Sequence, residues 1–110
     1  MCSNQHIRKE GLIKMKIIYK IDTAKIATEL FKIKRRARDI DAIKYAARCI
    51  SLIEKYGYED RGFLSPTRIK YIRFIGKIYA RSEKQKLVRD SFYKLIDENS
   101  KELISIKEND

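Results

Sequence analysis

The chain has 110 residues, a formal net charge of +11, one proline and four glycines. Its length favours a single domain with one core, and the scarcity of proline and glycine favours helices over a turn-rich β fold. Two distant cysteines, Cys2 and Cys49, exclude a disulfide framework and are typical of a reducing compartment. The expected location is therefore the cytoplasm, or the host cell interior if the protein is viral.

The charge and the hydropathy also limit the class of partner. So basic a chain attracts polyanions, with nucleic acid first and an anionic membrane or an acidic protein surface next. No stretch approaches the ~20 consecutive apolar residues that span a bilayer, and no membrane partner is expected.

Residues 1–14 are predicted to be a polar leader, with disorder as one reading. A single helical domain is expected over residues 15–110, and Met15 is an alternative start. The β-branched run from Ile17 to Ile21 is expected to be an extended segment packed against helices.

The first helix is predicted to begin with Asp22 or Thr23 as its N-cap. Its apolar residues are Ile26, Ala27, Leu30, Phe31 and Ile33. Its second half carries five cations within seven positions: Lys32, Lys34, Arg35, Arg36 and Arg38. The helix dipole favours cations near a C-terminus but accounts for only two or three of them, because like charges repel. A solvated face and an anion-binding cluster are equally expected.

Asp39 and Asp41 interrupt the basic run, and either can cap a second helix, predicted from Asp41 to Tyr56. One bent helix over residues 23–56 is the alternative, because the apolar spacing continues almost in phase. The inner face of the second helix is predicted to hold Ile43, Ala46, Ala47, Ile50 and Ile53. Cys49 is expected to be buried, and Gly57 to be the left-handed residue that ends the helix.

The third helix has the clearest start signal, with Ser65 as N-cap and Pro66 at its first position. Its spacing predicts a core face of Ile69, Ile72, Ile75, Ile78 and Tyr79. The other side, expected to face solvent, carries Lys70, Arg73, Lys77 and Arg81. Six basic residues and no acidic one lie between Arg61 and Arg81.

Ser82 and Gln85 form a capping-box pattern that begins a fourth helix. Its predicted inner face is Leu87, Val88, Phe92, Leu95 and Ile96. The helix ends at Asn99 or continues through Ile106. The chain is therefore predicted to be all-α, a small bundle of four or five helices with short connections.

The aromatic residues divide into two groups. Phe31, Phe92 and Tyr79 are expected in the core. Tyr71 and Phe74 follow cations on the third helix, so both packing in the core and stacking on bases remain open for them.

A longer pattern runs from Ala46 to Arg81 and resembles a recurrent helical module of phage and helicase-associated DNA-binding proteins. The small helical protein encoded beside the UvsW helicase in T4-like phages is of this kind. The matching positions are Ala46, Leu52, Ile53, Tyr56, Gly62, Leu64, Ser65, Ile72, Lys77 and Ile78. Arg68 stands where such modules usually have glutamine, and the turn is longer. The resemblance implies a phage-type accessory role beside a helicase, a nuclease or another host complex.

The candidate nucleic-acid-binding residues are Lys32, Lys34, Arg35, Arg36, Arg38, Arg68, Lys70, Tyr71, Arg73, Lys77 and Arg81. Their cations are expected to contact phosphates of DNA or RNA, which positions a nucleic acid without reading its sequence. The free N–H groups at Ser65–Arg68 add one phosphate contact. Single strands, branched DNA and duplexes all remain open.

The alternative function is a protein-binding inhibitor or adaptor that docks the same cationic face on an acidic surface of a host complex. An exposed apolar patch beside the charge favours this alternative, whereas a continuous cationic strip favours nucleic acid. Enzymatic activity is not expected, because no phosphate-binding loop, dinucleotide fingerprint or zinc-protease motif occurs. No metal or cofactor is expected, since the one histidine, His6, has no partner set.

Overall fold

The computed structural model describes residues 14–107, with side chains from residue 17 to residue 103. The predicted polar leader therefore lies outside the described residues, except for Lys14. The helices are α1 (Thr23–Arg36), α2 (Ile40–Glu59), α3 (Pro66–Tyr79) and α4 (Glu83–Glu98). The strands are β1 (Lys14–Ile21), β2 (Phe63–Leu64) and β3 (Ser100–Lys107).

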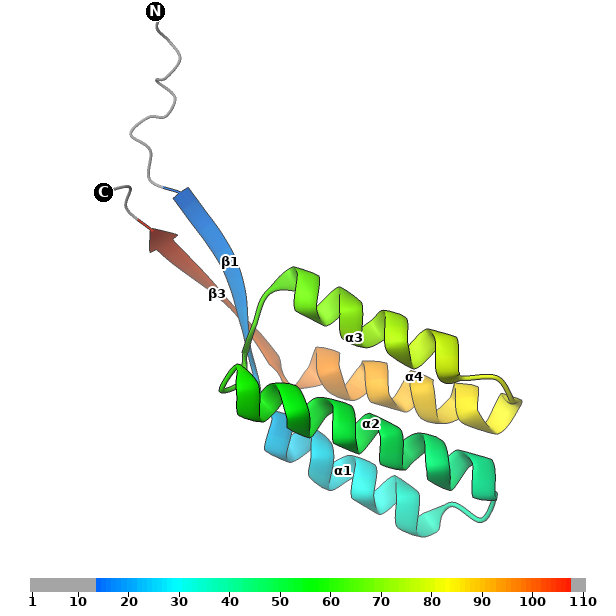
Figure 1. Cartoon of the computed structure of the whole chain (residues 1–110). Helices are drawn as coiled ribbons and strands as arrows, with labels where there is room; N and C mark the ends of the chain where they lie inside the picture. The colour runs from blue at the N-terminus through cyan, green and yellow to red at the C-terminus, as the bar shows by residue number, and fades with distance from the viewer. Residues whose placement is uncertain (1–13, 108–110) are drawn as a thin grey trace, which may run out of the picture.

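The predicted four-helix bundle with short connections is confirmed (Figure 1). A small antiparallel sheet in the order β2-β1-β3 is added to it. The sheet lies at the end of the bundle where α1 and α3 begin and where α2 and α4 end.

Each helix begins at a side chain that accepts a hydrogen bond from the backbone N–H three residues later. These caps are Asp22, Asp39, Ser65 and Ser82, with N···O distances of 3.0–3.2 Å. The Gln85 side chain completes the predicted capping box. The break between α1 and α2 is also confirmed, because Ala37 is extended and Asp39 starts a new helix. One bent helix is therefore wrong.

Gly57 lies inside α2 rather than after it, which corrects the predicted helix end at Tyr56. The helix continues to Glu59, and the left-handed residues are Arg61 (φ 54°) and Gly62 (φ 79°). A Cβ at position 57 would lie 2.8 Å from the Thr23 Cβ. The glycine is therefore needed for the close approach of α1 to α2.

Gly57→Ala is accordingly expected to destabilise the protein. Overpacking of this kind costs about 1–3 kcal/mol, and alanine's helix propensity offsets at most about 1 kcal/mol of that. Urea unfolding followed by circular dichroism measures the loss. The Thr23→Ala/Gly57→Ala double variant should recover part of it, because the threonine hydroxyl and methyl are removed. A Gly57→Ala variant more stable than the wild type would contradict this packing.

α4 ends at Asn99, one of the two predicted ends, and the chain returns as β3. β3 pairs with β1 in a register from Lys14↔Lys107 to Ile21↔Ser100. Continuation of the helix through Ile106 is therefore wrong. The extended segment at Ile17–Ile21 is confirmed as part of β1, and Ile21 is buried in the core.

The core lies between the helices and includes Ile26, Leu30, Ile53, Ile72 and Phe92. Cys49 is buried as predicted, and burial raises the pKa of its thiol to about 12. Of the aromatic residues expected in the core, Phe92 is fully buried. Phe31 and Tyr79 are 42% and 40% exposed, so their assignment was wrong. Leu87, expected on the inner face of α4, is also exposed.

α3 is held to the bundle by a narrow line of contact, because its buried residues are Ile72 and Gly76. The Tyr45 hydroxyl of α2 donates to the Gly76 carbonyl oxygen at 2.6 Å. Burial raises the pKa of Tyr45 well above its ordinary value, so the hydroxyl keeps its proton as a donor. From α4, the Tyr93 hydroxyl donates to the Arg73 carbonyl oxygen. The side of α3 opposite Ile72 and Gly76, which we call its outer side, is exposed.

Candidate nucleic-acid interface

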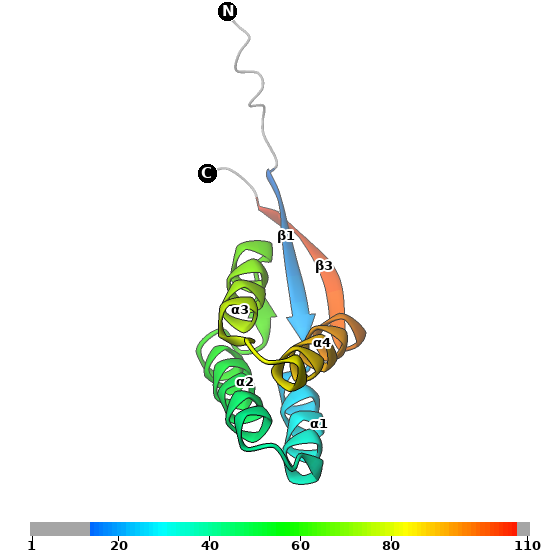
Figure 2. The ribbon, with the colours of Figure 1, turned by 90° about the vertical axis from the view of Figure 1, so that its right-hand side faces the viewer.

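The two predicted basic clusters lie on helices that do not pack together. Viewed from the end of the bundle, α1 and α3 occupy opposite corners, and α2 and α4 lie between them (Figure 2). The cations of α1 and those of α3 therefore do not combine into one flat surface. Each helix would therefore have to form an interface separately.

Two of the five cations in the α1 cluster, Lys32 and Arg36, contact polar groups of their own helix. The Lys32 Nζ lies 3.2 Å from a carboxylate oxygen of Glu29. The Arg36 Nε donates to the Lys32 carbonyl oxygen of the same helix at 3.3 Å. The other members are Lys34, Arg35 and Arg38. Lys34 and Arg35 lie in the last turn, where the helix dipole stabilises cations without a ligand, whereas Arg38 follows the C-cap residue Ala37.

Arg68 also has a structural role. Its Nε donates to a carboxylate oxygen of Asp60 at 3.2 Å, and its guanidinium carbon lies 4.3 Å from the Tyr56 ring centroid. Its backbone N–H is taken by the Ser65 cap, so fewer N–H groups are free for a phosphate there than the sequence predicts. Arg68 joins the end of α2 to the start of α3.

Arg73 does not face solvent in the way predicted for it, Lys70, Lys77 and Arg81. It forms an ion pair with Asp97 of α4, and its guanidinium carbon lies 5.1 Å from the Tyr93 ring centroid. Because Asp97 already neutralises it, Arg73 is a poor candidate for a phosphate contact. Because both side chains of the pair are partly exposed, replacing Arg73 should lower the free energy of unfolding by at most about 1 kcal/mol.

Three cations on α3 or just after it remain, and we name them the cationic line: Lys70, Lys77 and Arg81. All are exposed, and no carboxylate among residues 17–103 forms an ion pair with them. Lys70 and Lys77 are two helical turns apart, about 10.5 Å along the axis. Arg81 follows shortly after the helix. α3 itself contains no acidic residue.

An exposed apolar stripe runs beside the cationic line: Tyr71, Phe74 and Ile78, which are 46%, 57% and 43% exposed. Their three- and four-residue spacing keeps them on one side of the helix. Tyr71 and Phe74, which the sequence left open, are thus outside the core. Ile78 was wrongly assigned to the core.

The sequence missed one cation that contacts α3, Arg48 of α2. Its guanidinium carbon lies 3.9 Å from the ring centroid of Tyr79. Arg48 follows Tyr45, which contacts α3, by three residues and so lies on nearly the same side of α2. That spacing was the available signal. The contact adds a stacked arginine to the flank of α3 that faces α2.

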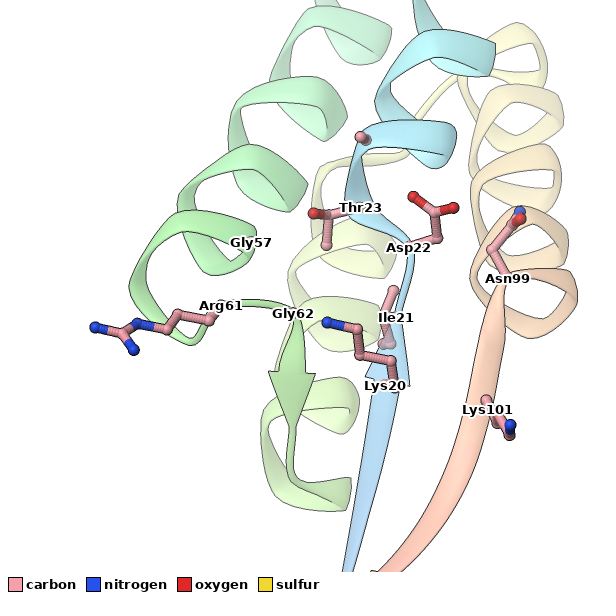
Figure 3. A pocket seen from close by; sticks show the side chains of 10 residues that line it. Lys20, Ile21, Asp22, Thr23, Gly57, Arg61, Gly62, Asn99 and Lys101 are labelled. Carbon is pink, nitrogen blue, oxygen red and sulfur yellow. The ribbon is translucent and has the colours of Figure 1, made fainter.

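A cavity of about 460 Å³ lies where β1 meets the start of α1, lined among others by Lys20, Asp22, Arg61 and Lys101. The Arg61 side chain points away from the other groups (Figure 3). The Asp22 carboxylate caps α1, and the Lys20 Nζ lies 4.1 Å from the Phe63 ring centroid. The charged groups do not converge on one ligand.

A second cavity, of about 380 Å³, lies between α3, the end of α4 and the sheet. Its lining includes Lys70 and Arg73 but also Asp97 and Glu102. Because carboxylates repel phosphates, this mixed lining is unsuited to a nucleic-acid backbone. The candidate interface is therefore the outer side of α3.

Comparisons with protein-family models, with curated proteins and with solved structures found no match. The resemblance of residues 46–81 to phage and helicase-associated modules stays a prediction. Among the described residues, no helix is long and apolar enough to cross a bilayer. No group of three His, Cys, Asp or Glu side chains in this part of the chain is arranged to hold a metal ion.

Proposed function

We propose that the protein is a small, non-catalytic nucleic-acid-binding accessory protein that holds a phosphate backbone on the outer side of α3. The observation that carries the proposal is the cationic line, three exposed cations without carboxylate partners in the described structure, on and just after a helix that has no acidic residue. Cations in this setting bind phosphates and release the counterions condensed on the nucleic acid.

The wider charge of the chain supports the same partner. A net charge of +11 raises the rate of encounter with any polyanion. Because the contacts are to phosphates, little sequence preference is expected. The resemblance to helicase-associated modules agrees with an accessory role beside a helicase or a nuclease.

The Lys70→Ala/Lys77→Ala variant tests this assignment, with Lys25→Ala/Lys101→Ala as a control of equal charge change. Lys25 and Lys101 are exposed and lie on α1 and β3. Fluorescence anisotropy of labelled oligonucleotides at ~50 mM salt should show a loss of roughly 10- to 60-fold for the α3 variant. The control should stay within about threefold, because distant exposed charges are screened.

Both variants should melt close to the wild type, since all four side chains are exposed. Equal losses of affinity in the two variants would show that net charge, and not α3, determines binding. Absence of measurable binding by the wild type at ~50 mM salt would reject the proposal.

A second candidate function, docking on a protein, is favoured by one observation. The apolar stripe is exposed beside the cationic line, as in many protein-binding surfaces. Such a partner would carry carboxylates beside an apolar patch. Rejection of nucleic-acid binding would leave this candidate in front.

A further inference from the structure

We infer that the outer side of α3 binds single-stranded nucleic acid and that Tyr71 and Phe74 stack on its bases. This inference rests on the proposed function and names its substrate class. Two of the three residues in the apolar stripe are aromatic, and Phe74 is 57% exposed. Base–aromatic stacking needs a free base face, which an unpaired strand offers and an intact duplex does not.

The arrangement of side chains on α3 suits a nucleic-acid strand that contacts both the cationic line and the apolar stripe. Tyr71 and Phe74 lie about 4.5 Å apart along the helix axis, on the same side of the helix. Lys70 precedes Tyr71, and Lys77 follows Phe74 by three residues, so the cations flank the aromatic pair. A backbone that follows the cationic line therefore brings its bases to the apolar stripe.

The Tyr71 ring is held in place before any ligand arrives. It makes an edge-to-face contact with the buried ring of Tyr56, with 6.2 Å between the centroids. Arg68 covers Tyr56 and pairs with Asp60, which fixes the start of α3. A ring that is already positioned loses little rotational freedom on binding. Tyr71 is thus a prepared platform for one base.

A duplex fits the same surface poorly. A helix in the major groove must meet base edges that carry hydrogen-bond donors and acceptors. Phe74 and Ile78 would cover those groups without pairing them, which carries a desolvation cost. Ring faces and apolar carbon suit base faces better than base edges.

A single tryptophan provides a direct reporter, because the chain contains none. The Phe74→Trp variant should show quenched emission when titrated with single-stranded oligothymidine or oligouridine, through stacking of a base on the indole. A matched duplex should leave the emission nearly unchanged. Tyr58→Trp is the control, since Tyr58 is 88% exposed near the end of α2 and lies about 200° around that helix from Tyr56, which contacts Tyr71 of α3. Its emission should not change with either ligand.

Phe74→Leu separates stacking from simple apolar contact, because leucine keeps a large apolar side chain but has no ring. The affinity for single strands should fall by roughly 5- to 150-fold, and the salt dependence should be unchanged because no phosphate contact is lost. Equal binding of single strands and duplexes, unaltered by Phe74→Leu, would overturn the inference. The proposed function would still stand if Lys70→Ala/Lys77→Ala abolished that binding. No binding of any nucleic acid would overturn both.

Discussion

Replacing Ile72 by alanine is expected to lower the free energy of unfolding by about 2–5 kcal/mol. The Ile72 side chain is 1% exposed and, with Gly76, forms the buried part of α3. Truncation leaves a cavity where α3 meets the rest of the bundle. Because α3 carries the proposed interface, the variant should also bind nucleic acid more weakly at urea concentrations near its unfolding midpoint, where part of the protein is unfolded.

The matched control is Ile78→Ala on the same helix. Ile78 is 43% exposed, so its truncation should cost less than about 1 kcal/mol. Urea unfolding followed by far-ultraviolet circular dichroism compares the two variants. Equal losses would mean that the buried side of α3 has been assigned wrongly.

Phe92→Ala is expected to lower the free energy of unfolding by about 3–5 kcal/mol. The Phe92 ring, near the middle of α4, is fully buried in the core cluster. Losing an aromatic ring there removes packing against several helices at once. The expected result is a large drop in melting temperature, or failure to fold at 37 °C.

Phe31→Ala is the comparison, because the same apolar spacing led us to expect both phenylalanines in the core. The Phe31 ring is 42% exposed. Its truncation should cost about 1 kcal/mol or less. Differential scanning calorimetry on both variants checks the ranking. A Phe31→Ala loss as large as that of Phe92→Ala would contradict the described packing.

The helix starts were predictable because capping is local. Asp22, Asp39, Ser65 and Ser82 each bond to a backbone group only three residues away. No knowledge of the tertiary fold is needed for such a signal. The ends of the helices were harder, because Gly57 looks like a helix terminator and instead admits Thr23 from another helix.

The partition of apolar side chains between core and surface was only half predictable. The spacing along α3 predicts an apolar side that is wider than the area covered by the neighbouring helices. Only the fold shows that Ile72 is buried while Ile78 and Phe74 are exposed. Ion pairs raise the same difficulty. Arg73 and Asp97 are 24 residues apart, and nothing in the sequence joins them.

β3 was missed because strand pairing depends on a distant partner. Leu103 pairs with Ile18 at the other end of the described chain. Read alone, the apolar residues after Asn99 continue the spacing of α4. These residues form a strand only because β1 is available to pair with them.

The central claim, that the cationic line of α3 holds phosphates, is tested most directly by salt dependence. Affinity for single-stranded oligothymidine is measured between ~50 and ~200 mM salt for the wild type and for Lys70→Ala/Lys77→Ala. Three phosphate contacts predict a log–log slope of about −2 for the wild type, and the loss of two predicts a slope flatter by about 1.4. Parallel slopes for the two proteins would contradict the claim.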